Sequence, residues 1–106
     1  MINKTYDTYQ YLKPKSDTFS KSDLITPNKK PIDIVLELNH LNAINNSLLG
    51  ILLDLNKDQI SKGCCLVVVK SNLNDFSDPD SLIVVPTLED AKDYIQMELI
   101  QRDLGF

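Results

Sequence analysis

The sequence contains few histidines and cysteines, the residues that most often bind zinc. It has one histidine, two cysteines, three glycines and no tryptophan in 106 residues. The two cysteines, Cys64 and Cys65, are adjacent, and neighbouring side chains in a strand point to opposite faces, so a disulfide between them is geometrically unfavourable. We interpret both as reduced, small apolar residues. Neither a metal site nor a cofactor is expected, because His40 is the only histidine that could complete such a site.

The sequence also lacks a strongly basic segment and a long apolar run. Its net charge is -4 and its pI is about 4.7, so the electrostatic attraction that brings proteins to nucleic acids and anionic membranes is missing. The longest apolar run, from Cys64 to Val69, is far shorter than the roughly 20 residues of a membrane span. The first residues are polar, unlike a secretory signal. We therefore expect a cytoplasmic protein that binds neither nucleic acid nor membranes.

No set of residues converges on a recognisable catalytic pattern. The glycines are too far apart for a phosphate-binding loop. In the acidic segment that begins at Asp75, Asp80 and Pro86 stand where a calcium-binding loop requires glycine and glutamate. His40 follows the end of an expected strand, where a solvated or backbone-bonded histidine is more common than a catalytic one. The sequence therefore predicts a protein that is not an enzyme.

The residues that are present predict a single α/β domain over residues 1–106. Hydrophobic residues make up 42% and charged residues 25% of the chain, which is ordinary globular composition. Apolar, β-branched runs predict strands at 32–38, 64–69 and 82–85, and a first strand is expected over 5–12. Residues 13–31 contain three prolines and are expected to be irregular, so residues 1–31 form a less regular part and 32–106 the core.

Two amphipathic helices complete this prediction. Over residues 45–62, leucines recur at helical spacing, while Asn56 and Gln59 are expected on the opposite, polar side. Ser47 is the expected N-cap and Gly63 the expected stop. The last helix follows Thr87 as its N-cap and ends near Gly105. Its expected buried stripe is Leu88, Ala91, Ile95 and Leu99, with Tyr94 and Met97 at the flanks. The expected fold is a mixed sheet of four to five strands, parallel at its centre, with helices packed on it.

The segment Asn45-Asn46-Ser47-Leu48-Leu49-Gly50, between a strand and an amphipathic helix, carries a resemblance to a known family. It resembles the centre of STAS domains, the fold of anti-sigma-factor antagonists, in which a turn ending Asp-Ser-Ser-Gly-Leu-Gly precedes the helix. Asn45 takes the place of the aspartate, Asn46 that of the phosphorylated serine and Ser47 that of the second serine. The likeness covers roughly residues 32–106.

The end of the chain, residues 82–106, also resembles that of small STAS-like proteins of Bacteroidetes, which are sometimes labelled ribonuclease Z. The two zinc ions of that enzyme need several histidines and aspartates, and this chain has one histidine. We therefore do not expect ribonuclease activity.

The resemblance implies a regulatory module whose partner is a protein, either an anti-sigma-factor-like kinase or another regulator. The implied contact surface is Asn45, Asn46, Ser47 and Leu48. Because Asn46 has no hydroxyl group, the usual phosphoserine switch is missing or moved, and Ser47 is the candidate phosphorylation site. The alternative is a non-catalytic accessory or dimerising protein associated with a nuclease or another enzyme. Homodimerisation is compatible with both.

Overall fold

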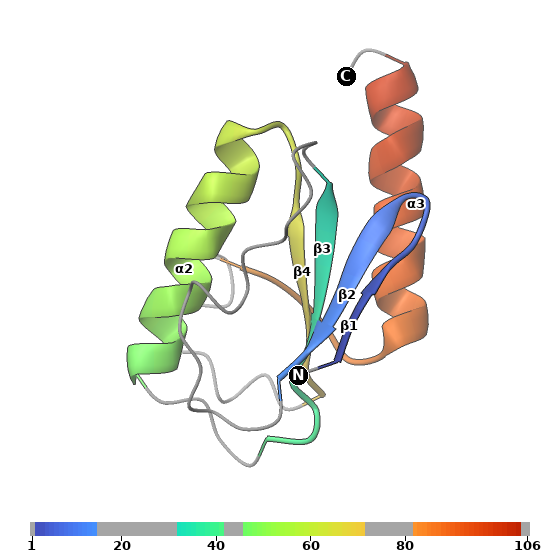
Figure 1. The fold of residues 1–106 in the computed structure, drawn as a ribbon. Helices are drawn as coiled ribbons and strands as arrows, with labels where there is room; N and C mark the ends of the chain where they lie inside the picture. Colours follow the sequence, from blue (N-terminus) through green and yellow to red (C-terminus); the bar gives the residue numbers. More distant parts are fainter. Residues whose placement is uncertain (1, 15–31, 42–45, 72–81, 105–106) are drawn as a thin grey trace.

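The computed structural model describes residues 2–14, 32–41, 46–71 and 82–104, and these form a five-stranded sheet flanked by helices (Figure 1). The strands are β1 (Ile2–Thr5), β2 (Tyr9–Lys13), β3 (Asp33–Glu37), β4 (Leu66–Val69) and β5 (Ile83–Val85), and they lie side by side in this order. β1 is antiparallel to β2, and each later pair of neighbours is parallel. The expected α/β class and the mixed sheet with parallel central strands are therefore confirmed.

The N-terminal part differs from the single strand expected over residues 5–12. The chain reverses direction within that range, so β1 and β2 form a hairpin. The amide of Tyr6 donates to the carbonyl of Tyr9 at 2.8 Å, and the two rings stack with centroids 4.9 Å apart. β2 is an interior strand, since it also pairs with β3. Residues 2–13 therefore belong to the main sheet, whereas most of the segment expected to be irregular, 15–31, lies outside the described residues.

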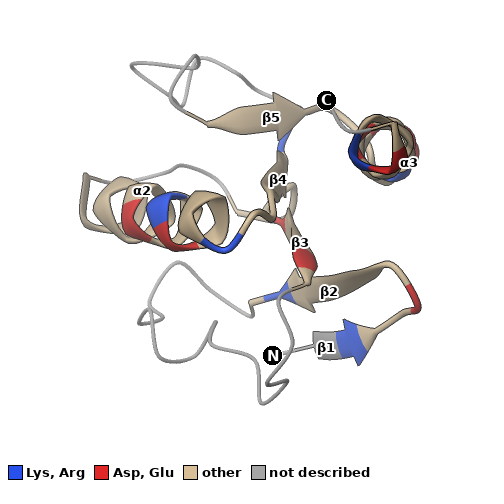
Figure 2. Cartoon of the chain, turned by 90° about the horizontal axis from the view of Figure 1, so that it is seen from above, with Lys and Arg blue, Asp and Glu red and all other residues tan. Residues whose placement is uncertain are grey.

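The two described helices, α2 (Asn46–Ser61) and α3 (Leu88–Asp103), cover opposite faces of the sheet (Figure 2). β3 and β4 lie between them, and apolar side chains of both strands have no exposed surface, among them Val35, Leu36, Val67 and Val68. Alternate residues of a strand point to opposite faces, so Leu36 and Val68 pack towards α2 while Val35 and Val67 pack towards α3. The continuous apolar runs in the sequence reflect this burial on both sides.

The end of α2 contradicts part of the predicted polar face. Asn56 and Gln59 are buried, with exposed fractions of 9% and 3%, whereas Ile60 is 64% exposed. The Gln59 amide group donates to the carbonyl oxygens of Ile32 and Cys65 at 2.8 and 3.1 Å. Ile32 and Cys65 directly precede β3 and β4, and the Cys65 carbonyl also accepts from the amide of Ile34 at 3.0 Å. Gln59 is therefore buried in a position where its polar group is paired with the backbone beside the sheet, which offsets the cost of burying it.

One of the two predicted N-caps is confirmed. The hydroxyl of Thr87 accepts a hydrogen bond from the amide of Asp90 at 3.2 Å and donates to the Asp90 carboxylate at 3.0 Å, so Thr87 caps α3. Helix α2, by contrast, begins at Asn46. Ser47 therefore lies within the first turn, and its prediction as the N-cap is wrong by at least one residue, a common uncertainty at helix ends.

On α3, the expected stripe is only partly buried. Ala91 and Ile95 are buried, and Leu88, Tyr94 and Leu99 pack around them at the edge of the cluster. Met97, expected at the flank of this stripe, is 59% exposed. It follows Ile95 by two residues, which places it about 160° around the helix, on the side away from the sheet. Neither described helix has the length and apolarity needed to cross a membrane.

Gly63 is the predicted stop of α2, and the structure explains why glycine is needed there. Its φ is 76°, in the left-handed region that glycine adopts without penalty. Gly50 lies inside α2, and a Cβ added at either glycine would meet no atom within 4 Å. The two glycines therefore differ in backbone conformation and not in the space around them.

We expect opposite effects on stability from Gly63→Ala and Gly50→Ala. Gly63→Ala should lower the free energy of unfolding by roughly 1–2 kcal/mol, because it forces a Cβ into the left-handed region. Gly50→Ala should raise the same quantity by roughly 0.5–1 kcal/mol, because alanine favours a helix interior. Urea denaturation of the two variants measures both. Shifts of the same sign would rule out backbone conformation as the cause.

Candidate functional site

The site predicted from the sequence lies at the edge of the sheet where the parallel strands end. β2, β3, β4 and β5 run in the same direction, and their carboxyl ends, together with the starts of α2 and α3, lie at the lower edge in Figure 1. We call this the carboxyl edge. In open α/β sheets, ligands and partners commonly bind at this edge, because loops and helix starts meet there.

Asn39 connects three strand ends at the carboxyl edge. Its side-chain oxygen accepts from the amide of Ser71, just after β4, at 2.6 Å. Its side-chain nitrogen donates to the carbonyl of Pro86, just after β5, at 3.2 Å. Its own amide donates to the carboxylate of Glu37 at 2.9 Å. One asparagine after β3 therefore fixes how β4 and β5 end beside it, a role that the sequence analysis did not identify.

The turn that leaves β3 is held by two further polar side chains. Lys70 is only 4% exposed, and its ammonium group donates to the carbonyl of Leu41 at 2.8 Å. The imidazole Nε2 of His40 is hydrogen-bonded to the carbonyl of Pro14, directly after β2. Of the two environments expected for His40, solvated or backbone-bonded, the structure shows the second. Residues 39–41 are fixed from both sides just before the chain continues towards α2.

The described members of the predicted contact surface differ in exposure. Asn45 lies outside the described residues. Asn46 and Ser47 are exposed in the first turn of α2, whereas Leu48 is 1% exposed and packs in the core between α2 and the sheet. Leu48 therefore faces the interior, and Asn46 and Ser47 are the two described members of the set that a partner can reach. The first turn carries no acidic side chain, so the positive end of the helix dipole is not neutralised by one there.

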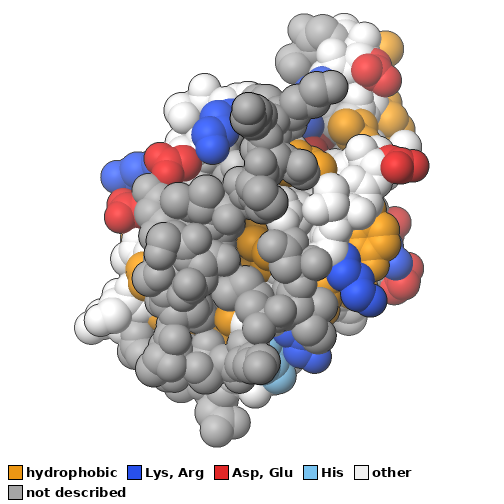
Figure 3. Space-filling view, in the orientation of Figure 1, with side chains coloured by type: hydrophobic (Ala, Val, Ile, Leu, Met, Phe, Trp, Pro, Cys, Tyr) orange, Lys and Arg blue, Asp and Glu red, His pale blue; other side chains and the backbone are white. Residues whose placement is uncertain are grey.

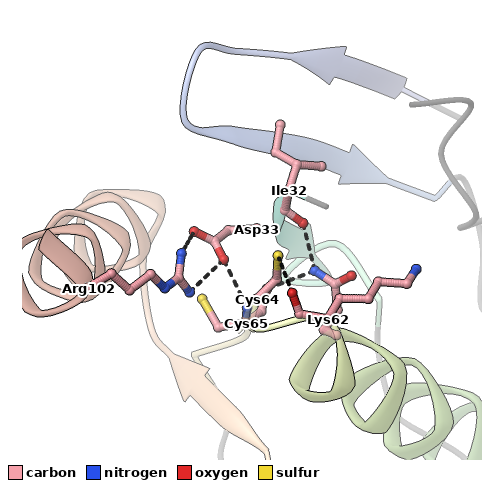
Figure 4. Close-up of polar contacts among 7 residues, drawn as sticks. Ile32, Asp33, Lys62, Cys64, Cys65 and Arg102 are labelled. Carbon is pink, nitrogen blue, oxygen red and sulfur yellow. Dashed lines mark hydrogen bonds and ion pairs between the residues drawn. The ribbon is translucent and has the colours of Figure 1, made fainter. Parts of the chain in front are cut away.

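A second polar cluster lies at the opposite edge of the sheet (Figure 4). The guanidinium of Arg102, near the end of α3, binds the carboxylate of Asp33 through two hydrogen bonds of 2.9 Å. Asp33 is 2% exposed and also accepts from the amide of Cys65 at 2.9 Å. The signal in the sequence was a single charge in the otherwise apolar run Ile32 to Leu36. Nothing in the sequence identified Arg102 as its partner.

The thiols beside this cluster are poorly suited to nucleophilic chemistry. Burial, reinforced by the charge of Asp33, raises the pKa of Cys65 to about 12. Burial also raises the pKa of Cys64, and the hydrogen bonds to Asp33 raise the pKa of Arg102. The reactive form of cysteine is the thiolate, which these shifts disfavour near neutral pH. The cluster is a structural link between α3, the first residue of β3 and the residue that precedes β4.

Across the described residues, no three histidine, cysteine, aspartate or glutamate side chains gather closely enough to hold a metal ion. No protein-family model matches the chain, and a search of curated proteins finds no match either. Function therefore has to be inferred from the residues and their geometry.

Proposed function

We propose that this chain is a non-enzymatic regulatory module that binds a protein partner through the carboxyl edge, in the manner of the anti-sigma-factor antagonists it resembles. The partner is an anti-sigma-factor-like kinase or another regulator. The observation that carries the proposal is the exposed pair Asn46 and Ser47 in the first turn of α2. The start of α2, which carries this pair, lies at the same edge of the sheet as the strand ends that Asn39 ties together (Figure 1).

A surface of this kind suits binding because part of it is already ordered. Association is weakened by the cost of fixing mobile groups at the interface. Here the Asn39 hydrogen bonds and the buried Lys70 hold the turn after β3 in place. Helix α2 is anchored by buried leucines, including Leu48 and Leu52. The exposed side chains at its start are therefore presented on a fixed frame.

The residue types at this surface also suggest how binding is regulated. The Asn46 amide can donate and accept hydrogen bonds but cannot be phosphorylated. Ser47 is the neighbouring hydroxyl, and a phosphate there would add about -1.5 to -2 charge at the positive end of α2. Negative charge is favourable at a helix start, so the fold tolerates the phosphate, while the contact surface becomes more negative. Ser47 is therefore the position at which phosphorylation regulates binding in this proposal.

A photo-crosslinking experiment identifies the partner. The chain is expressed in its native host with a photoreactive amino acid in place of Ser47, and adducts are identified by mass spectrometry. The control carries the same amino acid in place of Ile60, which is 64% exposed at the far end of the same helix. We expect a discrete protein adduct from the first position and none from the second. Adducts from neither position, or the same adduct from both, would contradict binding at the carboxyl edge.

Binding of the purified partner should then depend on the charge at Ser47. We expect Ser47→Glu to weaken binding about tenfold or more, since the new carboxylate lies in the contact, while the helix dipole keeps the fold stable. Ser61→Glu is the matched control, because Ser61 is exposed at the other end of α2. Isothermal titration calorimetry measures both affinities. Equal affinities for wild type and Ser47→Glu would show that the first turn of α2 is not the contact.

A further inference from the structure

Helix α3 carries a row of apolar side chains on the side away from the sheet. Met97, Ile100 and Leu104 are 59%, 50% and 66% exposed, although each is a large hydrophobic residue. Their spacing of three and then four residues places them on one face of the helix. Figure 3 shows hydrophobic side chains exposed along α3, at the upper right of the view. We call this row, with the acidic residues that precede it, the outer face of α3.

The charges on this face are mostly negative and lie near the start of the helix. Glu89, Asp90 and Asp93 are all exposed in the first two turns. The nearby lysine, Lys92, lies 3.9 Å from Glu89. The arginine at the other end, Arg102, is turned towards Asp33 on the sheet side. The outer face of α3 is therefore acidic in its first half and apolar in its second half.

We propose that the outer face of α3 is a second docking site, which binds an amphipathic helix with basic residues from a partner protein. Basic side chains are favoured near the C-terminus of a helix, so the partner helix lies antiparallel to α3. Its basic end then meets Glu89 and Asp93, and its apolar residues cover Met97 and Ile100. This goes beyond the proposed function, because α3 and α2 lie on opposite faces of the sheet (Figure 2).

The charge pattern favours such a partner over a second copy of the chain. In an antiparallel pair of α3 helices, the acidic start of each would lie beside the negative end of the other helix dipole. In that pair, Glu89 and Asp93 of each copy would also face the apolar second half of the other copy, and burying a carboxylate without a partner charge is costly. A partner helix with basic residues avoids both costs, because it places positive charge beside these carboxylates. With 16 residues, α3 is about 24 Å long, which is enough for a partner helix of four turns.

The test uses the full-length chain and two synthetic 18-residue peptides. Both peptides have leucines at positions i, i+3, i+4 and i+7 of an alanine-rich helix. One carries lysines in its C-terminal half and the other carries glutamates at the same positions. We expect the lysine peptide to bind with amide NMR shifts concentrated in residues 89–104, and to bind more weakly as salt rises. The glutamate peptide should bind at least about tenfold more weakly. No binding of the lysine peptide, or equal binding of both, would overturn the proposal.

Substitutions locate the site and separate it from the carboxyl edge. Ile100→Gln should weaken binding of the lysine peptide about tenfold, since an exposed anchor is lost. Ile60→Gln, which replaces an isoleucine on α2 that is 64% exposed against 50% for Ile100, should leave binding unchanged. Asp93→Lys should weaken binding of the lysine peptide and strengthen binding of the glutamate peptide. This substitution changes one charge and leaves Met97, Ile100 and Leu104 in place. Ser47→Glu should have no effect on either peptide.

Several results would overturn the docking site. Equal losses from Ile100→Gln and Ile60→Gln would show non-specific hydrophobic binding. Asp93→Lys without effect on either peptide would remove the electrostatic basis of the proposal. Sedimentation that shows a dimer in wild type and a monomer in Ile100→Gln would assign the face to a second copy instead of a basic helix.

Discussion

Replacing Arg102 with methionine is expected to lower the free energy of unfolding by about 3–5 kcal/mol, the cost of leaving a buried charge without its partner. Asp33 is 2% exposed, and both of its oxygens accept from the Arg102 guanidinium at 2.9 Å. After the substitution, the amide of Cys65 would remain as a donor to the Asp33 carboxylate. Denaturation by guanidinium chloride at pH 7, compared with wild type, measures the loss. Domains of this size have a total free energy of unfolding of about 5–15 kcal/mol, so the expected loss is a large part of the total.

Two further variants test whether the buried charge is the cause. Adding Asp33→Asn to Arg102→Met should recover a large part of the loss, because the side chain beside Cys65 is then neutral. Lys92→Met removes the exposed pair with Glu89, which is 3.9 Å long, and should change stability by less than about 1 kcal/mol. If Arg102→Met lowers the free energy of unfolding no more than Lys92→Met does, Asp33 is solvated in solution and its pair with Arg102 is not buried.

Leu48→Ala is expected to lower the free energy of unfolding by about 2–5 kcal/mol. The Leu48 side chain is 1% exposed and packs with leucines of α2 and apolar residues of β3 and β4. Truncation to alanine removes buried apolar surface and leaves a cavity that the packed sheet can only partly close. Ile60→Ala on the same helix is the control, because Ile60 is 64% exposed and should cost less than about 1 kcal/mol. Equal losses at the two positions would show that the burial of Leu48 does not set the effect.

A second substitution at Leu48 tests whether this residue acts only in the core or also contacts the partner. Leu48→Met conserves volume and should cost less than about 1.5 kcal/mol. If Leu48 acts only through packing, affinity for the partner identified by crosslinking should not change in this variant. Reduced affinity with normal stability would instead restore Leu48 to the contact surface implied by the resemblance.

The sequence alone determined the elements whose cause is local. The mostly apolar run Ile34 to Leu38 and the run Leu66 to Val69 favour strands covered on both faces, and they supply most of the interior strands β3 and β4. The leucine spacing of α2, the glycine at Gly63 and the cap at Thr87 each depend on residues a few positions apart, and each was predictable for that reason. The hairpin at Tyr6 was missed because its turn carries no glycine or proline signal.

The tertiary structure alone decided which distant side chains meet and which way each residue of the site faces. Asp33 and Arg102 are 69 residues apart, and Asn39 reaches a carbonyl 47 residues away. The resemblance places Asn46, Ser47 and Leu48 together, but helical rotation separates the exposed pair from the buried leucine. Met97 turned outwards and Gln59 inwards for the same kind of reason. Local pattern fixes the helix, whereas the position of the sheet beside it fixes which side is buried.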